Sequence, residues 1–178
     1  MKIVILGKSG SGKTTVVDII TENFRYDKVV TNTSRPMREG EVEGVDYNFL
    51  TDEEFDTLIE QGEFVEYFIA GNGWKYGTSK ESLEKDDIFI ILTPSGLDKL
   101  KEGKYDIVSI YVDVDDKTRY IRQLERGDDI KEVCRRSITD ENDFKNIEDK
   151  VDFIVHNDTN DVWNCVNEVL QLMSKINK

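Results

Sequence analysis

A glycine-rich stretch near the N-terminus has the composition of a phosphate-binding loop. Residues 7–14 read Gly-Lys-Ser-Gly-Ser-Gly-Lys-Thr, which fits the pattern G-x-x-x-x-G-K-[ST]. Glycines let backbone N–H groups turn inward around phosphate oxygens, and a helix that begins where the loop ends adds the positive end of its dipole. Lys13 is expected to reach the β- and γ-phosphates of a nucleoside triphosphate, and the Thr14 hydroxyl to bind Mg²⁺. The residues expected to contact the triphosphate are Gly7, Ser9, Gly10, Ser11, Gly12, Lys13, Thr14 and Thr15.

A second segment has the chemistry to hold another phosphate. Within the charged, glycine-bearing loop at residues 33–49, Arg35 and Arg38 lie three positions apart and Tyr47 follows them. The planar fork of arginine suits phosphate oxygens better than the point charge of lysine does. We therefore predict that this segment grips the phosphate of an acceptor molecule and faces the glycine-rich loop closely enough for a phosphoryl group to pass between them.

A third group of arginines predicts a mobile lid. Expected helices over residues 116–126 and 130–148 are separated by a break at residues 127–129, and arginines lie on both sides of it. A hinged pair of helices can bring positive charge to a transferring phosphoryl group and exclude water from it. Part of this cluster is equally compatible with solvated helix faces. The arginines concerned are Arg122, Arg126, Arg135 and Arg136.

The hydrophobic pattern predicts the elements that position these groups. An apolar strand is expected at residues 2–6, directly before the glycine-rich loop, and a helix with apolar residues on one face at 14–24. Strands alternating with helices along the rest of the chain predict an α/β fold with a parallel sheet. The further strands are expected at 27–31, 87–92, 106–112 and 152–156, and the further helices at 97–101 and 162–176. Residues 51–54, Thr-Asp-Glu-Glu, form a capping box that opens another helix.

Composition restricts the cellular setting. The 178 residues suit a single domain. The net charge of −13 disfavours lasting attachment to nucleic acid, and no apolar run approaches the roughly 20 residues that span a bilayer. Cys134 and Cys165 are too few for a disulfide scaffold or a zinc site, so we expect reduced core thiols and a cytoplasmic protein. The sequence leaves open whether it is a monomer or a homodimer.

Residues 33–49 resemble the guanylate kinase family. They match its T-[ST]-R-x-x-R-x-G-E-x-x-G-x-D-Y-x-F stretch, and the similarity runs from Lys2 to about Asp158. The resemblance implies a P-loop NTPase three-layer fold with a central parallel sheet, a small mixed α/β acceptor-binding insertion and a helical lid. It also implies transfer of the γ-phosphate of ATP to GMP or dGMP, with Mg²⁺. The expected division is a core of residues 1–32, 80–120 and 150–178, an insertion at 33–79 and a lid at 121–149.

The resemblance also implies roles for individual residues. Lys13, Arg38, Arg126 and one of Arg135 or Arg136, for which we choose Arg135, would act on the transferring group. Asn157 matches the family's asparagine on the adenine side of ATP. The residues that would hold GMP are Thr31, Arg35, Arg38, Tyr47, Glu66, Tyr76 and Thr78. Among these, Glu66 would read guanine, because a carboxylate can accept both the N1–H and a 2-amino N–H, which adenine does not offer.

One departure from the family keeps alternatives open. Family members usually carry acidic residues near the end of the strand that precedes Gly96, where this chain has Ile91, Thr93 and Ser95. Mg²⁺ would then rely on Thr14, the phosphates and water. A kinase for nucleoside monophosphates with another base preference is therefore the first alternative, and a non-catalytic guanylate-kinase-like binding module is the second. A small phosphosugar kinase would not need the full motif at residues 33–49.

Overall fold

The central sheet of the computed structural model is parallel throughout, as predicted. The structure describes residues 1–159 and 161–176. Its five strands lie in the order β2-β7-β1-β8-β9, and each neighbouring pair is parallel. They are β1 (Lys2–Leu6), β2 (Asp27–Lys28), β7 (Ile88–Ile91), β8 (Ile107–Asp113) and β9 (Phe153–His156). Except for the two-residue β2, their largely apolar sequences suit strands that are covered on both faces.

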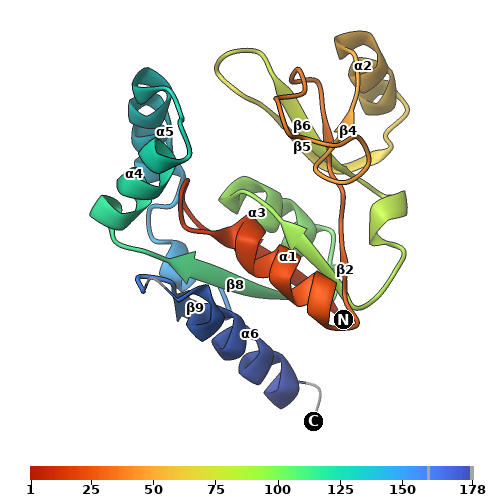
Figure 1. Ribbon diagram of the computed structural model, residues 1–178. Coiled ribbons are helices and arrows are strands. Elements are labelled where there is room, and N and C mark those ends of the chain that lie inside the picture. The colour runs from red at the N-terminus through yellow and green to blue at the C-terminus, as the bar shows by residue number, and fades with distance from the viewer. Residues whose placement is uncertain (160, 177–178) are drawn as a thin grey trace.

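Helices cover both faces of this sheet and complete three layers (Figure 1). Alternate residues of β1 point to opposite sides. Ile3 and Ile5 pack with buried residues of α1 (Lys13–Asn23) and α6 (Val162–Ile176). Val4 and Leu6 pack with residues of α3 (Pro94–Glu102) on the other face. The predicted α/β fold is therefore confirmed.

No helix among residues 1–159 and 161–176 has the length and apolarity to cross a membrane.

A second, smaller sheet stands between β2 and β7 in the sequence. Its strand order is β4-β3-β6-β5, with β3 (Asn32–Thr33), β4 (Asn48–Phe49), β5 (Phe64–Ile69) and β6 (Lys75–Ser79). The helix α2 (Asp52–Glu60) packs on it through Phe55, whose ring stacks on that of Phe64 at 4.5 Å. The predicted capping box is present, because Thr51 Oγ1 accepts from Glu54 N at 3.1 Å and Glu54 Oε2 accepts from Thr51 N at 2.7 Å.

Two expected elements are shorter than the sequence pattern suggested. The strand expected at residues 27–31 ends at Lys28, because the chain then crosses from the central sheet to the small one and Thr31 O accepts from Asn48 N. The helix α5 (Ile130–Asp143) ends before residue 148. Asn146 adopts a left-handed conformation with φ of 56°, and the chain turns so that Phe144 and Ile147 enter the core.

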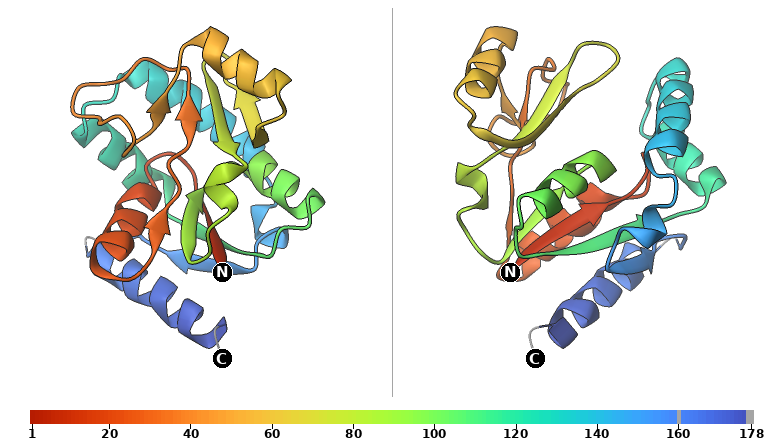
Figure 2. Two further views of the ribbon diagram at one scale, coloured as in Figure 1. Left: turned by 90° about the vertical axis from the view of Figure 1, so that its right-hand side faces the viewer. Right: turned by 180° about the vertical axis from the view of Figure 1, so that it is seen from behind.

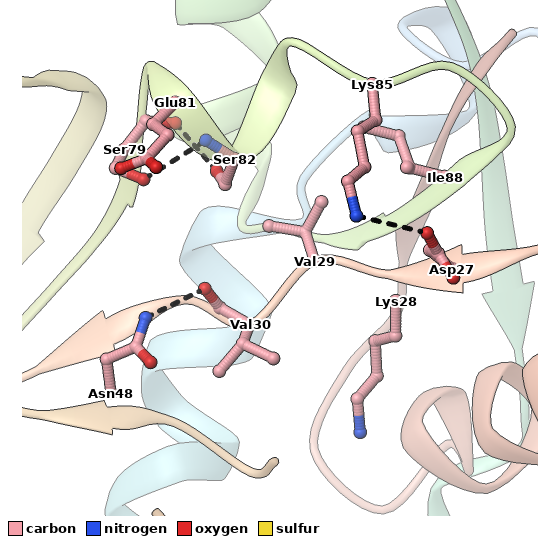
Figure 3. Close-up of a pocket in the computed structure, with 10 residues that line it drawn as sticks. All are labelled: Asp27, Lys28, Val29, Val30, Asn48, Ser79, Glu81, Ser82, Lys85 and Ile88. Atoms are coloured by element: carbon pink, nitrogen blue, oxygen red, sulfur yellow. Dashed lines mark hydrogen bonds and ion pairs between the residues drawn. The ribbon is translucent and has the colours of Figure 1, made fainter. Parts of the chain in front are cut away.

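The small sheet and the helical pair form two arms on the same side of the central sheet (Figures 1 and 2). The helical arm consists of α4 (Asp116–Glu125) and α5. The other arm joins the core through residues 29–31 and 80–87, and a hollow of about 480 Å³ lies between these connections (Figure 3). This hollow contains none of the residues predicted to bind a ligand. At the edge of the hollow, Asn48 Nδ2 of β4 donates to Val30 O in the first connection at 3.4 Å.

The two cysteines have different environments. Both are free, as expected. Cys165 lies in the core on α6, but Cys134 is exposed on α5. The expectation of two core thiols is therefore wrong for Cys134, because α5 packs on the rest of the molecule through other faces.

Candidate active site

The glycine-rich loop has the structural setting that its motif requires, between β1 and α1. Gly10 and Gly12 have φ of 80° and 86°, a region that residues with a Cβ rarely occupy. A Cβ on Gly10 would lie 2.5 Å from Arg119 O, and one on Gly12 would lie 2.6 Å from Asn157 Nδ2. Both glycines are therefore required by conformation and by close packing.

Lys13 extends back across the loop from the first turn of α1. Its Nζ donates to Gly7 O at 2.6 Å and to Lys8 O at 3.1 Å. Burial lowers the pKa of Lys13 to about 8, although the Asp140 carboxylate favours the charged form. Arg119, Arg126 and Arg136 add to the lowering. The ammonium group thus sits among other cations, an arrangement that favours an anion at the loop.

Buried polar atoms without partners gather around this loop. In the part of the chain that the structure describes, five buried side-chain atoms lack a hydrogen bond: Ser11 Oγ, Arg119 Nε, Arg122 Nη1, Gln123 Oε1 and Asn157 Oδ1. Each belongs to a residue that forms or adjoins the loop; for example, Asn157 Nδ2 donates to Ser11 O at 2.9 Å. Buried polar atoms are usually paired. Their concentration around the glycine-rich loop is what we expect of a site where a polar ligand supplies the missing hydrogen bonds.

The residues predicted to grip an acceptor phosphate lie together on the small sheet and its loop. Arg35 is buried, and its guanidinium lies 5.3 Å from the centre of the Tyr47 ring, which is 6.1 Å from that of Tyr76. The Arg35 fork holds Glu41 through Nη2–Oε1 at 2.7 Å and Nη1–Oε2 at 3.0 Å. Glu41 also accepts from the backbone N–H of Arg38 at 2.7 Å, while the Arg38 side chain is exposed.

Glu41 occupies the Arg35 fork as another anion could. Burial alone would raise the pKa of Glu41, but the hydrogen bonds from Arg35 and Arg38 hold it below its ordinary value. A bidentate arginine fork has the same geometry toward carboxylate and phosphate. The Arg35 guanidinium therefore has the geometry to bind two oxygens of a phosphate in place of the Glu41 carboxylate.

Glu66 is a buried carboxylate on β5, opposite Thr78 on β6. Thr78 Oγ1 donates to Glu66 Oε1 at 2.6 Å. Burial raises the pKa of Glu66, while the bonds from Thr78 act in the opposite direction. Its Oε2 would lie 3.2 Å from a Cβ on Gly96, so the carboxylate faces the first turn of α3. Thr31 is half-buried in the nearby crossing segment.

The start of α3 carries hydroxyls at the positions where the family resemblance implied acids. Thr93 caps the helix, because its Oγ1 accepts from Gly96 N at 3.2 Å, and it shares a hydrogen bond with Ser95 Oγ at 3.0 Å. Glu66 is therefore the carboxylate that faces this turn.

Three of the four arginines predicted for a lid are paired with acids of the same arm, whereas Arg122 donates to the backbone oxygens of Asn157 at 2.8 Å and Thr159 at 3.1 Å. Asp128 accepts from Arg126 Nε at 3.0 Å and from Arg136 Nη1 at 3.2 Å. Glu132 accepts from Arg135 Nη2 at 2.8 Å, and this bond is the main cause that lowers its pKa to about 2. The hydrogen bond from Arg126 lowers the pKa of Asp128, with a smaller contribution from Arg38 on the opposite arm. The charges of the two arms therefore act on each other.

Three residues at the loop were not predicted from the sequence as part of the site. Arg119, on α4, is the largest fully buried side chain of the described residues. Gln123 and Asp140 are buried beside it. Arg119 and Gln123 are four residues apart, a spacing that indicates only that they share one face of α4. No local sequence pattern linked either residue to the glycine-rich loop.

The hydroxyl of Thr14 is the loop oxygen predicted to hold a magnesium ion. Thr14 lies exposed in the first turn of α1, and within residues 1–159 and 161–176 no group of three or more His, Cys, Asp or Glu could hold a metal. Mg²⁺ is commonly held by one or two protein oxygens together with phosphates and water. The donor set therefore fits an ion that arrives with its nucleotide.

The fold and these anion sites define a P-loop nucleotide kinase class. The family model for guanylate kinase matches residues 1–175, and the chain belongs to the guanylate kinase family. Guanylate kinase of Streptococcus agalactiae serotype III (strain NEM316) is 39% identical over 145 residues, covering 76% of this chain and 68% of that protein. The enzyme of Vibrio parahaemolyticus serotype O3:K6 (strain RIMD 2210633) is 32% identical over 165 residues, covering 87% and 79%.

A solved structure supports the same assignment. The crystal structure of guanylate kinase from Anaplasma phagocytophilum matches with a TM-score of 0.73 and 25% identity, and covers 97% of this chain and 84% of that chain. The resemblance recognised in residues 33–49, and the enzyme class it implied, are therefore confirmed.

Proposed function

We propose that this chain transfers the γ-phosphoryl group of ATP to GMP or dGMP, forming ADP and GDP or dGDP. The main support is the presence of two separate anion sites, one built on the glycine-rich loop and one on Arg35. An arginine-bearing arm stands beside them. The positive charge of Arg38 on the other arm contributes to the lowered pKa of Asp128 on this arm. Phosphoryl transfer needs chiefly alignment and charge neutralisation, which such an arrangement can supply.

ATP would bind along the loop and the first turn of α1. The amides of Gly10, Ser11, Gly12, Lys13, Thr14 and Thr15 would surround the phosphates, with Gly7 forming the floor of the loop. Ser9 would use its hydroxyl, because its N–H is engaged by Asp140. Thr14 would hold Mg²⁺, which neutralises charge on the β- and γ-phosphate oxygens when bound. Asn157 and the unpaired atoms around Gly12 would face the nucleoside.

Lys13 makes the binding of ATP dependent on pH. In the free protein its pKa is lowered to about 8, whereas a bound triphosphate holds the proton. Affinity for MgATP should therefore be constant below about pH 7.5 and fall by up to about tenfold per pH unit above pH 8. Isothermal titration calorimetry at pH 9, in two buffers of different ionisation enthalpy, should detect uptake of a proton. Lys13→Arg stays protonated and should lose this slope; a slope that persists would contradict the assignment.

The acceptor phosphate would replace Glu41 in the Arg35 fork. Arg35 is then paired in both states, so its buried charge is never left alone. Arg38, Tyr47 and Tyr76 would complete the grip on the phosphate. Glu66 would accept the N1–H and the 2-amino N–H of guanine in its ionised form, with Thr31 and Thr78 near the base.

The helical arm would act as the lid. Arg126 and Arg135 are held by Asp128 and Glu132 in this structure, and closure would exchange these carboxylates for the transferring phosphoryl group. We propose residues 121–149 as the lid, 33–79 as the second mobile arm, and residues 1–32, 80–120 and 150–178 as the fixed core. Closure of both arms excludes water, which would otherwise hydrolyse ATP.

A coupled assay of ADP release tests the proposal. With MgATP, the full chain should turn over GMP and dGMP far faster than AMP, UMP or dTMP. Fastest turnover with another monophosphate would support a different base preference, which the hydroxyls of Thr93 and Ser95 in place of acids favour as the second candidate. Absence of turnover with all five, with MgATP binding intact, would support the non-catalytic binding module.

A further inference from the structure

Both backbone polar groups of Ser9, its N–H and its carbonyl oxygen, are held by buried side chains of the helical arm. Asp140 Oδ2 accepts from Ser9 N at 2.7 Å, and Arg119 Nη1 donates to Ser9 O at 3.0 Å. Gln123 Nε2 also donates to Ser9 O, at 3.3 Å. An ion pair of 3.5 Å between Arg119 Nη1 and Asp140 Oδ2 closes the ring. We call Arg119, Gln123 and Asp140 the Ser9 clamp.

The clamp is almost fully removed from solvent. The exposed fractions are 1% for Arg119, 1% for Gln123 and 9% for Asp140. Arginine and aspartate are rarely buried to this degree unless they are paired. A buried ion pair gives little net stability compared with apolar residues of similar size, although removing one partner is costly. Stability alone is therefore a weak reason for this cluster, and its contacts to the backbone of one loop residue, Ser9, suggest a second role.

The clamp joins the glycine-rich loop to both helices that carry the lid arginines. Asp140 lies one turn beyond Arg136 on α5, and Arg119 lies on α4. The α4 backbone also touches the loop, because a Cβ on Gly10 would lie 2.5 Å from Arg119 O. Lys8, the neighbour of Ser9, is paired with Glu141 on α5 through its side chain at 2.8 Å. The loop and the arm are therefore joined by polar contacts at the loop backbone itself.

We propose that Asp140, together with Arg119, is a positioning residue for ATP: it fixes the backbone at Ser9 and so aligns the following loop amides with the phosphates. This inference rests on the proposed use of the loop for ATP. It does not depend on which monophosphate is the acceptor. Asp140 does not touch the nucleotide itself, and its effect passes through the loop backbone.

The test compares substitutions at Asp140 in the full chain. Asp140→Ala should raise KM for ATP, and the calorimetric Kd for MgATP, by roughly tenfold to a hundredfold, because amides displaced by a fraction of an ångström hold phosphate poorly. KM for GMP should stay within about twofold. Asp140→Asn keeps an oxygen that can accept from Ser9 N–H and should recover most of the affinity for MgATP. It should still unfold at a lower temperature than the parent, because Arg119 loses one of its two charged partners and keeps only Asp116, which is on the same helix.

A double variant separates positioning from stability. Arg119→Leu combined with Asp140→Ala removes both buried charges, so its melting temperature should return toward that of the parent while MgATP binding stays weak. Recovery of both properties would overturn the proposal, and so would an Asp140→Ala protein that loses stability but binds MgATP normally. Glu141→Gln is the matched control on the same helix and should leave KM for ATP within about twofold. A parent that binds MgATP but does not phosphorylate GMP would contradict the proposed acceptor, not the clamp.

Discussion

Glu66→Gln should reduce the preference for GMP over AMP by at least about a hundredfold, out of the 10⁴-fold or more that a buried polar reader can supply. The Glu66 carboxylate is buried, bound by one hydroxyl, and has Oε2 directed at the first turn of α3. Ionised, it can accept two hydrogen bonds from guanine, whereas an amide offers one acceptor and one donor. In Glu66→Gln, the amide NH₂ group would face a guanine N–H. Both groups are donors, so no hydrogen bond would form between them.

The ratio of kcat/KM for GMP to that for AMP measures this effect directly. Glu63→Gln is a suitable control, because Glu63 is exposed and lies directly before the same strand. The loss should appear mainly as reduced kcat/KM for GMP, with KM for ATP unchanged. A Glu66→Gln protein that keeps the parental ratio would show that another group reads the base.

Lys13→Met should lower kcat by roughly 10²- to 10³-fold, the range found when one charge-stabilising donor is removed from an active site. The Lys13 ammonium lies across the loop, where its donors reach Gly7 O and Lys8 O without a nucleotide. In the proposed reaction the ammonium group would stabilise the negative charge that develops on the β- and γ-phosphates. Methionine keeps the volume and removes the charge.

Stability measurements guard against a folding explanation. The pKa of Lys13 is lower in the folded protein, at about 8, than its ordinary value of 10.5, so its charged form destabilises the fold at all pH values below about 8. Lys13→Met should therefore have a free energy of unfolding at pH 7 no lower than that of the parent. Lys8→Met, in the same loop but paired with Glu141, should keep kcat within about twofold. A Lys13→Met protein with the parental kcat would show that Lys13 has no role in catalysis.

Local patterns were sufficient for much of this molecule. The glycine-rich loop, the strand before it and the helix after it follow from backbone requirements that act within a few residues, and so does the capping box at Thr51. The motif at residues 33–49 led to the correct family because its arginines, glycines and tyrosine are close in sequence. Four β–α steps, read from apolar runs, led to the correct parallel sheet.

Local patterns were less informative where a segment changes partners. The strand expected at residues 27–31 is divided, because its second half leaves β7 for the small sheet. The helix expected to continue to residue 148 stops at Asp143, because Phe144 and Ile147 gain more from burial in the core than from continued helix. In both places the competing contacts come from parts of the chain far away in sequence.

The amino-acid sequence by itself determined which groups are available to bind phosphate, since loop conformation and side-chain chemistry are local properties. Only the tertiary structure decided which charges are paired and which are buried. Arg35 is held by Glu41, Arg126 and Arg135 by Asp128 and Glu132, and Arg119 by Asp116 and Asp140. The environment of a charge depends on every element packed around it, and for Arg119 these elements include a loop 110 positions away in the sequence.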